Sequence, residues 1–176
     1  MEGTAKDVPR PVSASRSELA ELMNPAYANI QGNVHGGHIL KLIDECCGLC
    51  AVRHSRSACV TVSMDSVSFV QPVRIGDVLT LRAELSWVGA KAMEAEVEVY
   101  SEKPTTGVRT LTNRAHAVYV AVDENGRPKP VAPLLIETAE QRARFEAGAL
   151  RQQARLEARA REKARASAPT DPTTTR

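Results

Sequence analysis

Aromatic residues are scarce in this sequence. Only 3% of its 176 residues are Phe, Trp or Tyr, so the core must be built largely from aliphatic side chains within the 43% of residues that are apolar. This is enough for one compact domain and too little for two ordinary ones. Long apolar runs are missing as well: residues 1–18 lack the apolar stretch of a signal peptide, and no segment approaches the length of a membrane span. We therefore expect a cytoplasmic protein that does not insert into membranes.

A strong excess of charge is also lacking. The formal net charge of +2 is too small to indicate nucleic acid or an anionic membrane as the main partner. The four cysteines are Cys46, Cys47, Cys50 and Cys59. Cys47 and Cys50 have the C-x-x-C spacing of redox and zinc sites, but no second pair follows and the histidines do not complete a ligand set. We interpret them as small buried thiols and expect no metal.

The most informative segment is 36–54, whose apolar residues lie almost all round a helix. Such a pattern predicts a buried helix rather than one on the surface. Its polar positions follow the spacing i, i+3, i+4, i+7 and share one narrow face. They are Lys41, Asp44, Glu45 and Gly48.

After this helix the apolar period switches to two residues. Segments 60–64 and 67–69 alternate with opposite parity, which predicts a β-bulge near Asp65–Ser66. Segments 79–87 and 93–99 each have one dry and one wet face, and 115–122 is apolar on both faces. An antiparallel sheet can bury such a helix by curling around it. The pattern predicts an α+β hotdog fold, with the antiparallel sheet wrapped around a long central helix.

The ends of the chain differ from the domain in composition. Residues 1–16 are expected to form a flexible arm, 17–136 the hotdog domain, 137–166 an added C-terminal helix, and 167–176 a disordered tail. Thr138 and Gln141 have the spacing of a capping box at the start of that helix. Its first half is expected to dock on the domain and its second half to be solvated. Segment 17–23 favours a helix by propensity but is short, and composition leaves it open.

A carboxylate on an apolar helix is costly unless it is paired or faces a wet cleft. Asp44 is therefore a candidate catalytic acid or base, with Glu45 as possible support. The alternative is a structural Lys41–Glu45 pair beside a merely solvated Asp44, and spacing alone favours neither.

The loop before the helix strengthens the catalytic interpretation. Segment 29–37 contains amides and glycines, and it leads directly into the helix start. Free N–H groups at Gly36 and Gly37, with the positive end of the helix dipole, predict an oxyanion site. Asn33 and His35 are candidate supporting residues, although hydrogen-bonded structural roles are expected for His35 and His38.

The run NIQGNVHGGHILKLIDECCGLCAVRH resembles the active-site segment of the cytosolic acyl-coenzyme A thioester hydrolases of the hotdog superfamily. The resemblance continues through VTVSMDSVSFVQPVRIGDVL, LTNRAHAVYVAV and ETAEQRARFEAG, and so covers about residues 17–150. It implies that segment 17–23 is the first strand. It also implies that Asn29 and Asp44 act together from two different hotdog domains, in a homodimer or in a hexamer of three such dimers. The Cys46-Cys47 pair departs from the small residues common in the family.

The resulting hypothesis is an acyl-CoA thioesterase that acts on medium- to long-chain acyl-CoA. Asp44 activates water or attacks the thioester, and Asn29 of a neighbouring subunit orients the reactants. Arg53, Lys91 and Arg114 are candidates for binding the coenzyme A phosphates. Because thiolate is a good leaving group, no cofactor is expected. Two alternatives stay open: a hotdog hydratase or dehydratase, and a non-catalytic acyl-CoA-binding regulator.

Overall fold

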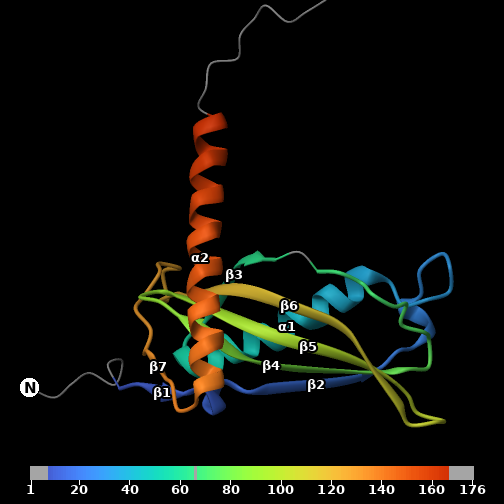
Figure 1. Ribbon diagram of the computed structural model, residues 1–176. Coiled ribbons are helices and arrows are strands. Elements are labelled where there is room, and N and C mark those ends of the chain that lie inside the picture. Colours follow the sequence, from blue (N-terminus) through green and yellow to red (C-terminus); the bar gives the residue numbers. More distant parts are fainter. Residues whose placement is uncertain (1–7, 66, 167–176) are drawn as a thin grey trace, which may run out of the picture.

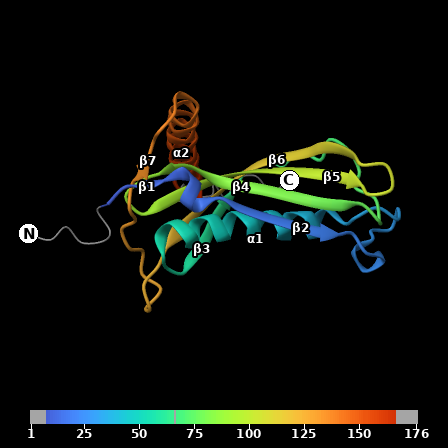
Figure 2. The ribbon, with the colours of Figure 1, turned by 90° about the horizontal axis from the view of Figure 1, so that it is seen from below.

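The computed structural model describes residues 8–65 and 67–166. Its main sheet contains five antiparallel strands in the order β2-β4-β5-β6-β3. Figure 1 shows this sheet lying along the helix α1, and Figure 2 shows α1 and α2 on opposite faces of it. This is the predicted hotdog arrangement with an added C-terminal helix. The elements are β1 (Arg10–Pro11), η1 (Val12–Ser15), β2 (Ser17–Leu22), η2 (Pro25–Tyr27), α1 (Gly36–Ser55), β3 (Cys59–Met64), β4 (Val78–Val88), β5 (Ala92–Lys103), β6 (Val108–Ala121), β7 (Leu134–Leu135) and α2 (Ala139–Ala166).

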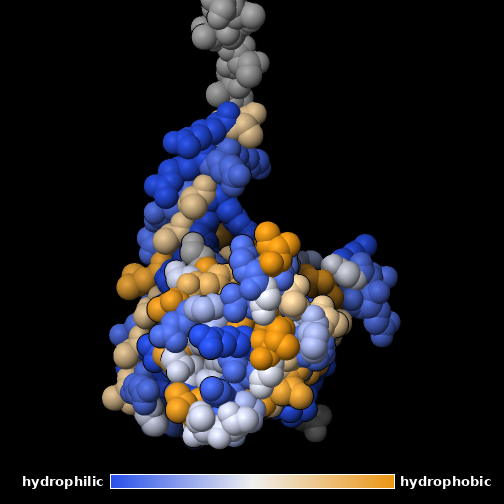
Figure 3. All heavy atoms as spheres, turned by 90° about the vertical axis from the view of Figure 1, so that its right-hand side faces the viewer, coloured by the Kyte–Doolittle hydropathy of each residue, from blue (hydrophilic) through white to orange (hydrophobic). Residues whose placement is uncertain are grey.

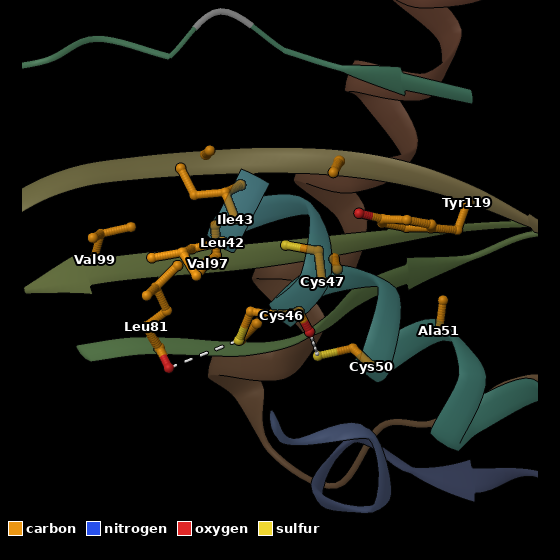
Figure 4. Packing of buried hydrophobic residues seen from close by; sticks show 14 of the residues in the cluster. Leu42, Ile43, Cys46, Cys47, Cys50, Ala51, Leu81, Val97, Val99 and Tyr119 are labelled. Atoms are coloured by element: carbon orange, nitrogen blue, oxygen red, sulfur yellow. Dashed lines mark hydrogen bonds between the residues drawn. The ribbon is translucent and has the colours of Figure 1, made fainter. Parts of the chain in front are cut away.

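Helix α1 is the centre of the core, as its pattern predicts. It contacts all five strands of the main sheet, and Figure 4 shows its side chains packed against labelled residues of β4, β5 and β6. Each fully buried Leu or Ile contributes about 1.5–3 kcal/mol. Cys46, Cys47 and Cys50 are free and buried within this packing. Burial raises the pKa of Cys46 to about 12, so these thiols act as packing groups.

Composition leaves segment 17–23 open between helix and strand, and the strand that the family resemblance implies is confirmed as β2. β2 pairs with β4 from Ser17↔Ala83 to Leu22↔Val78, because pairing along a sheet edge outweighs the weak preferences of six residues. The predicted bulge is misplaced. The register shift against β6 lies between Thr61 and Ser63, and residues 67–69 are not a strand.

The prediction of a flexible arm over residues 1–16 is wrong for residues 10–16; residues 1–7 lie outside the described residues. β1 pairs in parallel with β7, and Val12 is buried in the core. Ser15 is fully buried, and its hydroxyl donates to the Val12 carbonyl and accepts from the Leu85 N–H. Prolines at positions 9 and 11 suggested a loose arm, but a two-residue edge strand accommodates Pro11.

Helix α2 begins with the predicted cap. Thr138 accepts from the Gln141 N–H, while the Gln141 side chain accepts from the Glu137 N–H. Figure 1 shows the helix crossing the strands and then projecting beyond the sheet. Residues 156–166 are exposed in the single chain, and Figure 3 shows the projecting part as largely hydrophilic. The predicted tail, 167–176, lies outside the described residues. Within the described part of the chain, no helix is long and apolar enough to span a membrane.

The docked half of α2 buries part of the sheet face that the alternating pattern predicts to be exposed to solvent. Glu94 is fully buried there, where its carboxylate accepts hydrogen bonds from Ser86, Arg151 and Arg155. A register shift in β4 between Leu85 and Trp87 accompanies this change. Trp87 then lies against Gly148 of α2 and is not part of the buried cluster around α1.

Candidate active site

Asp44 lies at the middle of α1 and is half-buried. Its Oδ1 atom accepts a hydrogen bond from the Thr61 hydroxyl at 2.8 Å and another from the Tyr119 hydroxyl at 2.9 Å. Thr61 and Tyr119 are cross-strand partners on β3 and β6, so their side chains point to the same face of the sheet. The carboxylate is therefore held by two strands, and it is not merely solvated.

The neighbouring carboxylate has a different role. Glu45 forms the predicted i, i+4 ion pair with Lys41 at 2.7 Å, and both side chains are largely exposed. The hydrogen bond to Glu45 raises the pKa of Lys41. The surface pair and the anchored Asp44 thus coexist on one helix, and within the described residues no hydrogen bond or ion pair joins Glu45 to Thr61 or Tyr119.

Asn29 organises the loop before α1. Its Oδ1 accepts from the Gln31 N–H at 2.9 Å and from the Asn33 N–H at 3.1 Å. The Asn29 N–H also donates to the Asn33 carbonyl at 2.7 Å. Within the described ranges its Nδ2 group has no acceptor. Asn33 thus supports this loop through its backbone, while the side-chain Nδ2 group of Asn29 stays available to a ligand.

The helix start offers one of the two predicted oxyanion donors. His35 is the N-cap, and its Nδ1 accepts from the Gly37 N–H at 2.9 Å, so the Gly37 donor is already used. The Gly36 N–H has no acceptor among residues 8–65 and 67–166. A Cβ on Gly36 would lie 3.4 Å from the Phe69 ring, which therefore covers one side of this helix start.

The basic candidates for coenzyme A binding lie apart from Asp44 in the single chain. Arg53 and Arg114 line a cleft of about 990 Å³ that α2 forms with β2, β4, β5 and β6. Arg53 donates to the Arg16 carbonyl, and Arg114 pairs with Glu98 at 2.8 Å. Lys91 is exposed in the turn between β4 and β5.

One chain does not bring the two halves of the predicted site together. Gly36 and Asp44 are eight residues apart on one helix, which corresponds to about 12 Å along its axis. No hydrogen bond or ion pair joins the Asn29 loop to Asp44 in the described part of the chain. No group of three or more His, Cys, Asp or Glu side chains there is arranged to hold a metal ion.

Sequence reasoning missed Thr61 and Tyr119. Thr61 occupies the polar parity of its predicted strand, and Tyr119 lies in a strand predicted to be apolar on both faces. The sequence shows a polar side chain in each of these strands, but it does not show that the two residues are cross-strand partners, because that depends on the register between distant segments. That register is a property of the folded sheet.

Comparison with known sequences identifies the family to which this chain is similar. The profile of the Thioesterase superfamily matches residues 31–108. The mouse cytosolic acyl coenzyme A thioester hydrolase is 36% identical over 142 residues, which are 80% of this chain and 37% of the mouse protein. This chain thus spans little more than a third of that relative. YkhA of Bacillus subtilis strain 168, an uncharacterized acyl-CoA thioester hydrolase, is 38% identical over 66% of this chain and 68% of its own length.

Solved structures give the same relationship. A hexameric acyl-CoA thioesterase in its apo form superposes with a TM-score of 0.79 at 37% identity, over 92% of this chain and 99% of that one. The acyl-CoA hydrolase of Staphylococcus aureus, solved with butyryl coenzyme A, coenzyme A and coenzyme A disulfide, gives a TM-score of 0.81 at 26% identity over 89% and 96%. The chain belongs to the acyl-CoA thioester hydrolase family of the thioesterase superfamily.

Proposed function

We propose that this protein hydrolyses acyl-CoA thioesters to a carboxylic acid and coenzyme A, at a site built by two chains. The observation that carries the proposal is the Asp44 carboxylate, which Thr61 and Tyr119 hold by one oxygen only. The other oxygen, Oδ2, has no protein partner within the described residues. A carboxylate held in this way can accept a proton from water or attack a carbonyl carbon.

In the proposed reaction, water attacks the thioester carbonyl carbon while Asp44 takes a proton from that water. In a variant of this reaction, Asp44 itself attacks the carbonyl carbon, the carbon–sulfur bond breaks to leave a mixed anhydride, and the thiolate takes a proton from solvent; water then cleaves the anhydride to the free acid and restores Asp44. In the first route, the developing charge on the carbonyl oxygen is stabilised by the Gly36 N–H and by the positive end of the α1 dipole. When the tetrahedral intermediate collapses, the carbon–sulfur bond breaks. The proton held by Asp44 passes to the departing thiolate, so free acid and coenzyme A thiol result.

The second half of the site is assigned to a partner chain. The helix start of one chain lies about 12 Å along α1 from its own Asp44, and no hydrogen bond or ion pair joins the Asn29 loop to that carboxylate within the described residues. Two antiparallel α1 helices would instead place each loop beside the other chain's carboxylate. The hexameric state of a similar acyl-CoA thioesterase supports an oligomer, and we propose three such dimers for this chain. Structures of the Staphylococcus aureus hydrolase include separate alanine variants of an aspartate, a threonine and an asparagine. This chain has those residue types at Asp44, Thr61 and Asn29.

The proposed substrate is a medium- to long-chain acyl-CoA. Leu49 and Val52 follow Asp44 along α1 and are 40% and 42% exposed, so they offer apolar surface to an acyl chain. Arg53 and Lys91 are the proposed contacts for the coenzyme A phosphates. Arg114 is a weaker candidate because Glu98 already pairs with it.

Release of free thiol from acyl-CoA of increasing chain length tests the activity directly. Asp44→Asn is expected to lower kcat by about 100-fold or more, because it removes the base. Glu157→Gln, the same chemical change on the exposed part of α2, is expected to leave kcat unchanged. An Asp44→Asn variant with near-normal kcat would remove Asp44 from the mechanism, and a loss on Glu45→Gln in its place would move the base to Glu45.

A further inference from the structure

Tyr119 makes two contacts to the residue proposed as the base. Its hydroxyl lies 2.9 Å from Asp44 Oδ1 and 3.0 Å from the Asp44 backbone carbonyl oxygen. One hydroxyl proton is thus shared between the side chain and the main chain of the same residue. A donor that bridges these two acceptors restricts the rotation of the Asp44 side chain about its Cα–Cβ bond.

The donor itself is fixed in place. Tyr119 is 2% exposed, and it is paired in register with Thr61 on one side and Met93 on the other. Its ring lies against α1 at Gly48, where an added Cβ would be 3.6 Å from ring atom Cε1. Figure 4 shows the hydroxyl end of Tyr119 directed toward α1. Burial raises the pKa of Tyr119 well above its ordinary value, so the phenol stays a neutral donor throughout any assay range.

Thr61 and Tyr119 both donate to Oδ1, and this asymmetry has a chemical consequence. A carboxylate oxygen that accepts two hydrogen bonds has both lone pairs engaged. Water or substrate must therefore approach the other oxygen. We propose that Tyr119 is a positioning residue that holds the Asp44 carboxylate with Oδ1 toward the sheet and presents Oδ2 to the reaction. The inference rests on the proposed function, because it assigns a role through Asp44.

Tyr119→Phe removes the hydroxyl and keeps the ring. Loss of the hydroxyl is expected to decrease kcat by about 10- to 100-fold, which is about 1.4–2.7 kcal/mol at about 1.36 kcal/mol per tenfold change in rate. KM for acyl-CoA is expected to stay within about three-fold, since the hydroxyl does not contact substrate. Tyr100→Phe is the matched control: Tyr100 also donates to a carboxylate, Glu98 at 2.7 Å, but on a different part of the sheet. Its kcat is expected to equal that of the wild type.

A double-mutant cycle separates positioning from a general loss of structure. In the Asp44→Asn background, Tyr119→Phe is expected to cause no further loss of the residual activity, because the hydroxyl acts only through the carboxylate. Equal fractional losses in both backgrounds, or a Tyr119→Phe kcat within three-fold of wild type, would overturn the inference. If Asp44→Asn itself were active, the proposed base would fail instead. Should the Phe variant not fold, 4-fluorophenylalanine at position 119 fills the same space without a donor and carries the same expectation.

Discussion

At the scale of single residues, Glu94 is a charged side chain that the alternating pattern predicts to be exposed but that is fully buried. Burial alone would raise the pKa of Glu94, but hydrogen bonds from Arg151, Ser86 and Arg155 outweigh it, and the net pKa lies below the ordinary value. The hydrogen bond from Arg155 likewise lowers the pKa of Asp65. The network joins α2 to β5 and, through Asp65, to the residue that directly follows β3. β3 is the strand that carries Thr61.

Replacing Glu94 by Gln leaves two arginines without their shared charge partner. Breaking a buried ion pair in this way costs about 3–5 kcal/mol, so urea unfolding at pH 7 is expected to show a loss of roughly this size. Because the folded-state pKa of Glu94 is lowered, its contribution is present above its ordinary pKa of about 4.3 and is lost as pH falls through the folded value. The difference between wild type and Glu94→Gln should therefore shrink between pH 7 and pH 3.5.

Glu96→Gln is the matched control for this experiment. Glu96 is two residues along the same strand, and the salt bridge that it forms within the described residues, to His116, spans 4.0 Å. A partly exposed pair at this distance is expected to contribute less than about 1 kcal/mol. A constant difference between wild type and Glu94→Gln across the pH range would contradict the assignment of a charged Glu94. Protein concentration must be held fixed in an oligomer.

At the scale of elements, α2 docks through a glycine. Gly148 is the one buried residue of this helix, and a Cβ there would lie 2.6 Å from the Trp87 Cβ and 3.0 Å from Glu94 Oε1. Ala is the better helix former by about 1 kcal/mol. The clash reverses that preference, because neither the strand nor the buried network can move freely.

Gly148→Ala is therefore expected to destabilise the protein by about 1–3 kcal/mol, measured by thermal or urea unfolding. Gln153→Ala, on the exposed side of the same helix, is expected to change stability by less than about 0.5 kcal/mol. If Gly148→Ala raised the melting temperature, as it would in a solvated helix, the close contact between α2 and β4 would be refuted.

The same element shows how far sequence reasoning reaches. Local patterns were sufficient for α1, whose apolar residues lie all round, and for the Thr138 cap of α2. They could not show which sheet face α2 covers, so the burial of Glu94 was missed. The pairing of Thr61 with Tyr119 depends on a register between segments far apart in the sequence. The Gly37 N–H was predicted to be free, but the rotamer of His35 engages it, and periodicity does not encode rotamers.

At the scale of the whole molecule, the proposed site is divided between two places on the chain, which no hydrogen bond or ion pair joins within the described residues. One consists of the Asn29 loop and the Gly36 helix start, and the other is Asp44 with its two donors. In a two-fold symmetric dimer each contact occurs twice, so the proposed arrangement would complete two sites in a pair of chains. A sheet edge at β3 and the exposed apolar residues of α1 are consistent with a second copy beside this helix.

Subunit mixing tests this arrangement without a structure of the complex. Asn29→Ala and Asp44→Asn homo-oligomers are each expected to be inactive, because every site in them lacks one member of the pair. If the two variants are unfolded, mixed in equal amounts and refolded, half of the dimers contain one chain of each kind. Each mixed dimer has one site with both residues intact and one site with neither, so thiol release should return to about a quarter of the wild-type rate.

The control is a mixture of the Asp44→Asn and Tyr119→Phe variants. Both changes affect the Asp44 side of the proposed site, so no mixed dimer regains an intact site. Recovery in the first mixture alone would follow from a shared site. Its absence, after refolding of the wild type under the same conditions had restored activity, would mean that Asn29 and Asp44 of one chain serve the same site.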